Sequence, residues 1–90
     1  MKPLYLTQAW ISQEYDGDVG LEIVDKGKEI AFFITRDTPI VITPYSASGL
    51  RKLIGDACHV CTSTTQHGVR VVGSVDEIAG KITDYLEWSQ

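Results

Sequence analysis

Long apolar runs and cysteines are both scarce in this sequence of 90 residues. No apolar run approaches the roughly 18 to 20 residues that a helix needs to span a bilayer, and residues 1–8 lack the continuous apolar stretch of a signal peptide. The two cysteines are too few for the disulfide framework of a small secreted domain. These absences predict a cytoplasmic protein without a membrane partner.

Clusters of positive charge are also missing. The sequence has 8 Lys and Arg residues against 12 Asp and Glu residues, which gives a formal net charge of −4. Arg51 and Lys52 form the only adjacent basic pair. Binding driven by phosphate neutralisation needs clustered cations that release counterions, so nucleic acid is not an expected partner.

Motifs for catalysis are absent as well. The sequence contains no Gly-x-Ser-x-Gly nucleophile elbow, no P-loop and no Gly-x-Gly-x-x-Gly phosphate cradle. Oxygen-bearing side chains alternate over residues 16–22 as in a calcium loop, but the third oxygen ligand and the final bidentate Glu are not in place. We therefore expect a non-enzymatic protein without a cofactor.

The length of the chain predicts one domain. A chain of this size buries roughly 60 to 65% of the surface of its unfolded state, which is enough for a single core. The sequence shows neither an internal repeat nor a linker. We therefore expect a single domain over residues 1–90.

The first half of the sequence predicts a meander of antiparallel strands. Apolar and polar residues alternate loosely there, and the intervening stretches are rich in Gly, Asp and Pro, which favour turns. The expected strands are residues 4–13, 19–24, 29–35 and 40–42, and the expected turns are residues 16–18, 25–28 and 36–39.

The second half predicts two helices around one short strand. Thr43 is a suitable N-cap and Pro44 fits a first helical position, so a helix is expected after them. Val69–Val72 is typical of a strand, and Ser74 with Glu77 forms a capping box that begins the second helix. The apolar stripe of the first helix is Ala47, Leu50, Leu53, Ile54, Ala57 and Cys58.

These elements combine into an α+β fold. We expect an antiparallel sheet of four to five strands, in the chain order ββββαβα, with two helices packed on the sheet. Residues 62–68 are polar and without helical periodicity, which predicts an exposed loop.

Aromatic residues occupy several of the expected strand positions. If helices cover only one face of the sheet, aromatic side chains on the other face stay exposed unless a partner covers them. Trp and Tyr are common anchors of protein interfaces, and acidic side chains on a hairpin steer a basic partner. We therefore predict a small binding protein of the inhibitor or adaptor type that docks on another protein and forms a homodimer. Its expected partner-binding residues are Trp10, Tyr15, Asp16, Asp18, Glu22 and Phe33.

A Cys-x-x-Cys motif followed by a histidine supports an alternative. Cys58, Cys61 and His67 are residue types that bind zinc, although a structural site needs four ligands. The cysteines also fit a thiol switch, but a position near the end of the expected helix favours protonated, inert thiols. The ordinary interpretation is that Cys58 is a small core residue on the helix stripe. A metal-binding or thiol-switch module is the alternative that these residues leave open.

A third interpretation is a homo-oligomer that sequesters a small molecule. Arg36, Arg51 or Arg70 would then bind an anionic ligand with two hydrogen bonds. In size, charge and layout the chain resembles small accessory proteins of phages and mobile elements and small inhibitors or immunity proteins. That resemblance implies a binding role and assigns no site residue.

Overall fold

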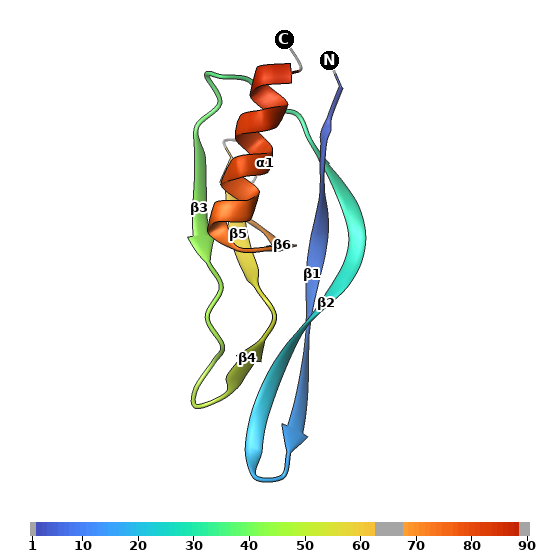
Figure 1. Cartoon of the computed structure of the whole chain (residues 1–90), viewed down its shortest axis with the longest axis vertical. Helices are drawn as coiled ribbons and strands as arrows, with labels where there is room; N and C mark the ends of the chain where they lie inside the picture. The colour runs from blue at the N-terminus through green and yellow to red at the C-terminus, as the bar shows by residue number, and fades with distance from the viewer. Residues whose placement is uncertain (1, 63–67, 89–90) are drawn as a thin grey trace.

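Six strands and one helix form the computed structural model, which describes residues 2–62 and 68–88 (Figure 1). The strands make one sheet in the order β3-β5-β6-β1-β2-β4, in which β2 and β4 are parallel and the other neighbours antiparallel. The elements are β1 (Leu4–Asp16), β2 (Val19–Phe32), β3 (Ile40–Pro44), β4 (Lys52–Ile54), β5 (Ala57–Thr62), β6 (Val69–Val72) and α1 (Val75–Trp88).

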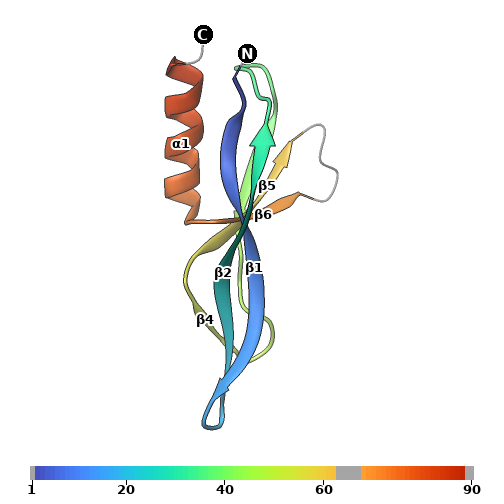
Figure 2. The same ribbon diagram turned by 90° about the vertical axis from the view of Figure 1, so that its right-hand side faces the viewer.

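The molecule is elongated, with principal extents of 50 × 19 × 19 Å. The helix α1 lies over one end of the sheet, and the β1–β2 hairpin extends far beyond it to the opposite end (Figure 1). Seen from the side, α1 covers a single face, whereas the β5–β6 hairpin projects from the other (Figure 2). Part of the sheet therefore has no helix on either face.

The β1–β2 hairpin departs from the expected meander. The turn expected at residues 16–18 is confirmed, because β1 ends at Asp16 and β2 begins at Val19. The turn expected at residues 25–28 is wrong, since β2 continues through them. Two predicted strands are therefore one strand of 14 residues.

A bulge explains how β2 passes through this glycine-containing stretch. The pairing of β1 with β2 shifts between Thr7 and Ala9, where β2 holds one residue more than its partner. Gly27 lies at this shift, and a Cβ atom there would overlap the indole ring of Trp10. The glycine therefore allows close packing under an aromatic ring and does not make a turn.

The prediction of a first helix after Pro44 is also wrong. Pro44 is the last residue of β3, and the residues after it form an irregular segment followed by β4 and β5. Gly49 and Gly55 adopt φ values of +63° and +103°, which a right-handed helix does not allow. The three-to-four-residue spacing of apolar residues here comes from two short strands and a turn, and not from one helix face.

The second expected helix is confirmed as α1, and the short strand before it as β6. The backbone N–H of Glu77 donates to Ser74 Oγ at 3.2 Å, and the N–H of Ile78 donates to the carbonyl of Ser74 at 3.0 Å. The first of these bonds satisfies one of the free N–H donors at the helix start, and the second is the first hydrogen bond of the helix itself. Over residues 2–62 and 68–88, no helix is long and apolar enough to cross a membrane.

The core lies between α1 and the sheet. The buried face of α1 meets strands from both halves of the chain, and the packed cluster is Leu6, Phe32, Ile34, Cys58, Val60, Val71, Ile78 and Ile82. The expected fold class therefore needs correction. The described chain is a six-stranded mixed sheet with one helix, in place of an α+β fold with two helices on four to five antiparallel strands.

Candidate functional site

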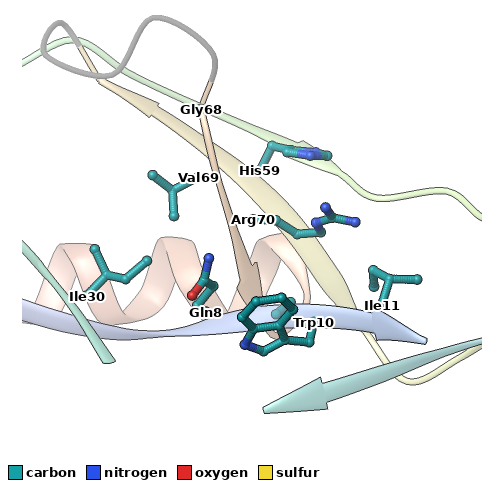
Figure 3. A pocket seen from close by; sticks show the side chains of 9 residues that line it. Gln8, Trp10, Ile11, Ile30, His59, Gly68, Val69 and Arg70 are labelled. Carbon is teal, nitrogen blue, oxygen red and sulfur yellow. The ribbon is translucent and has the colours of Figure 1, made fainter. Parts of the chain in front are cut away.

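A groove opens where the β5–β6 hairpin diverges from β1. Among the described residues, the two strands β1 and β6 meet in register at a single pair, Gln8 with Val71. The cavity there has a volume of about 700 Å³, and Figure 3 shows the side chains that line it. Its lining includes Gln8, Trp10, Ile30, His59, Val69 and Arg70.

A second, smaller cavity continues the first. It has a volume of about 230 Å³, and Ile30 and Val69 line both cavities. Phe33 lines the smaller cavity and is 66% exposed, while Trp10 lines the larger one and is 58% exposed. We call the two cavities together the groove; it has an exposed aromatic side chain in each of its two parts.

Two polar atoms in the wall of the groove lack a partner. Gln8 Oε1 and Arg70 Nε are both buried, and neither makes a hydrogen bond with any described residue. In Figure 3 the side chain of Gln8 lies between those of Ile30 and Arg70. A buried polar atom without a hydrogen bond destabilises the fold, so each such atom calls for an explanation. A bound ligand that supplies the missing partners would provide one.

The guanidinium of Arg70 lies over the aromatic ring of Tyr45. The Arg70 Cζ atom lies 5.2 Å from the centroid of the Tyr45 ring, a distance typical of a cation–π contact. The His59 ring is tilted by 48° against the same ring, with the centroids 6.0 Å apart. Tyr45 thus holds the two basic side chains of the groove in place.

Tyr45 is itself fixed by a buried carboxylate. Its hydroxyl donates to Glu22 Oε1 at 2.5 Å, and Ser48 Oγ donates to Glu22 Oε2 at 2.8 Å. The Ser48 backbone N–H donates to both oxygens at 3.3 Å. The hydrogen bond from Tyr45, followed by those from Ser48, lowers the pKa of Glu22, and the same bond raises the pKa of Tyr45. The carboxylate is therefore charged at neutral pH.

This arrangement changes the role expected for Glu22. Its side chain is only 1% exposed, and its oxygens already accept hydrogen bonds within the chain. A partner in solution cannot reach it, so we assign Glu22 to positioning Tyr45 and not to contact with a partner.

The other predicted acidic residues lie far from the groove. Asp16 and Asp18 are exposed at the turn of the β1–β2 hairpin, and Tyr15 beside them is 70% exposed. The guanidinium of Arg51 lies 5.2 Å from the Tyr15 ring centroid and donates to its hydroxyl at 3.2 Å. Of the six predicted docking residues, only Trp10 and Phe33 line the groove, while Tyr15, Asp16 and Asp18 lie together at the hairpin turn.

The cysteines occupy opposite faces of one strand. Cys58 is completely buried in the core, and Cys61, three residues along β5, is half-buried on the other face. Burial, followed by the negative charge of Glu77, raises the pKa of the Cys58 thiol. The predicted ligand His67 lies outside the described residues, and no group of three or more potential metal ligands occurs within them.

The three arginines considered for an anionic ligand do not converge. Arg36 is exposed in the turn before β3, Arg51 lies against Tyr15, and Arg70 alone lines the groove. Sequence reasoning did not single out Gln8 or Tyr45. No local pattern marks them, because their importance comes from strands that are distant in the sequence. No protein-family model, curated protein or solved structure matches this chain.

Proposed function

We propose that the protein is a non-enzymatic binding module, of the inhibitor or adaptor type, that docks on another protein through the groove. The observation that carries this proposal is the pair of exposed aromatic side chains, Trp10 and Phe33, in two adjoining cavities that share Ile30 and Val69 in their lining. Large aromatic side chains in such a setting dominate the binding energy of many protein interfaces.

The dimensions of the groove favour an extended segment of the partner. Trp10 pairs with Asp25 on β2, and Phe33 follows the end of that strand. Eight residues of strand separate Asp25 from Phe33, which corresponds to about 25 Å at roughly 3.3 Å per residue. A partner segment of about eight extended residues would contact both aromatic side chains.

Selection from a random peptide library displayed on phage tests this proposal without a known partner. Enriched peptides are synthesised, and their affinity is measured by fluorescence anisotropy. We expect Trp10→Ala and Phe33→Ala each to weaken binding by about tenfold or more, because each removes an aromatic anchor. Tyr15→Ala is the matched control, since Tyr15 is at least as exposed but lies at the hairpin turn. Equal losses in all three variants, or none in the groove variants, would contradict the proposal.

A second copy of the chain is the second candidate occupant, and it would make the protein a homodimer. The described lining of the groove contains His59 and Arg70 and no acidic residue, whereas the hairpin turn carries exposed Asp16 and Asp18. Opposite charges on the two surfaces favour insertion of one copy's turn into the other's groove.

Charge reversal tests this dimer by sedimentation velocity. Arg70→Glu alone and the double variant Asp16→Lys/Asp18→Lys alone should both sediment as monomers. An equimolar mixture should recover the dimer, because each interface then regains opposite charges. A monomeric wild-type protein at all concentrations would exclude the dimer and leave docking on another protein.

A further inference from the structure

We infer that the groove recognises an acidic residue of the partner segment. The carboxylate of that residue binds Arg70, and its backbone N–H donates a hydrogen bond to Gln8 Oε1. This inference rests on the proposed function, because it specifies the chemistry of the segment that the groove takes.

The unpaired atom of Arg70 is the one that a carboxylate would use. A guanidinium presents Nε–H and one Nη–H side by side, and a carboxylate accepts both with its two oxygens. Arg70 Nε is buried without a hydrogen-bond partner in the described structure, at the wall of the groove. Side-on binding of a carboxylate would satisfy this atom and add a second bond in the same plane.

The guanidinium is prepared for such a contact. Its position over the Tyr45 ring fixes one face of the group, and the bond from Tyr45 to the buried Glu22 fixes the ring. Little side-chain freedom then remains to be lost on binding, which favours affinity. Glu22 thus acts on the ligand site through Tyr45 and does not touch the ligand.

The charge of Arg70 has no counterpart in the groove. The described residues that line the two cavities include no Asp or Glu, although the whole chain carries a net charge of −4. The nearby Glu22 carboxylate already accepts bonds from Tyr45 and Ser48. A half-buried cation without a paired anion favours a ligand that brings one.

Gln8 distinguishes a peptide from a simple anion. Its Oε1 atom is a buried acceptor without a donor, and both Gln8 and Arg70 line the larger cavity. A free ionised carboxylate supplies acceptors only. An aspartate or glutamate within a peptide supplies its carboxylate for Arg70 and an N–H for Gln8, which matches both unpaired atoms.

A double-mutant cycle tests this inference. A groove-binding peptide from the library selection is compared with its Asp→Asn or Glu→Gln form, on wild-type protein and on Arg70→Ala. On the wild type, we expect loss of the peptide charge to weaken binding by about tenfold, as for hydrogen bonds between charged groups. On Arg70→Ala the same peptide change should have no further effect, and Arg70→Lys should recover only part of the affinity.

Arg51→Ala is the matched control, because its guanidinium lies over a tyrosine ring at the same distance of 5.2 Å but outside the groove. Its affinity for the peptide should equal that of the wild type. Thermal unfolding shows whether each variant folds. Peptides that bind through Trp10 but tolerate loss of their carboxylate would overturn this inference and leave the proposed function standing. A failure to obtain any peptide that depends on Trp10 and Phe33 would overturn both.

Discussion

The two ends of the molecule are held together by different forces. One end, the helix-covered half, packs α1 on the sheet through a cluster of apolar side chains. The other end, which we call the arm, consists of residues 10–25 of the hairpin with residues 45–51 beside them, and no helix covers it (Figure 2). Its one fully buried large side chain among the described residues is Glu22.

The difference shows that stability and precise side-chain geometry come from different parts of this small chain. Apolar burial is nondirectional and supplies most of the stability of a fold, whereas hydrogen bonds to a carboxylate are directional and set geometry. In this protein the helix-covered half supplies Val69 and Ile30 to the groove, and the arm supplies the cluster that positions Tyr45 below Arg70. The groove lies at the junction and depends on both.

The largest effect on stability should come from the core of the helix-covered half. Ile78 is fully buried against the sheet, so Ile78→Ala removes buried apolar surface and leaves a cavity. We expect a loss of about 2 to 5 kcal/mol in the free energy of unfolding, measured by urea denaturation. Lys81→Ala, at an exposed position of the same helix, should change it by less than about 0.5 kcal/mol. Equal effects at both positions would show that α1 does not carry this core.

A smaller effect should come from the arm. Tyr45→Phe removes the hydroxyl that donates to Glu22 and leaves one carboxylate oxygen short of a donor. We expect a loss of about 1 to 2 kcal/mol, with faster hydrogen exchange confined to residues 45–51. If hydrogen exchange also becomes faster throughout α1, the two halves unfold as one cooperative unit. That result would contradict the claim that different interactions stabilise them.

Low pH should weaken the arm selectively, because the arm depends on the charged carboxylate of Glu22. The bonds from Tyr45 and Ser48 lower the pKa of Glu22 below its ordinary value of 4.5. The charged carboxylate therefore contributes its full stabilisation above a pH of about 4.5, and this contribution is lost as the pH falls through the lowered pKa. The difference in Tm between the wild type and Glu22→Gln should accordingly shrink below pH 4.5. A difference that stays constant as the pH falls would show that the charge does not hold the arm.

The smallest effect on stability is expected at the junction. In Gly27→Ala the new methyl group must displace the indole of Trp10, while the backbone at residue 27 stays in an ordinary strand conformation. We expect a change of less than about 1 kcal/mol in stability but a clear shift in tryptophan fluorescence and weaker binding of groove peptides. Gly80→Ala, where an added Cβ meets nothing, should leave both signals unchanged.

Local sequence patterns were sufficient where one interaction decides the structure. The capping box of Ser74 and Glu77 predicted the start of α1, and the residues at 16–18 predicted the hairpin turn. Patterns failed where tertiary packing decides. Gly27 resembles a turn residue, yet it lies within β2 because Trp10 needs the space above it.

The groove was predictable only in part. Trp10 and Phe33 were expected at an interface, and the structure places both in the groove, although their role in binding stays a prediction. Gln8 and Arg70 come from β1 and β6, and the pairing of these strands depends on sheet topology, which no local pattern encodes. Glu22 was expected on the surface, and only the arrangement of Tyr45 and Ser48 explains its burial.

The measurement that tests the central proposal most directly is an NMR titration of ¹⁵N-labelled protein with a selected acidic peptide. Docking in the groove predicts the largest shift changes at the Trp10 indole N–H, the Gln8 side-chain amide and the backbone of Phe33. The amides of Asp16 and Asp18 at the hairpin turn should not move. Shift changes concentrated at that turn or along α1, with the groove signals unchanged, would contradict the account.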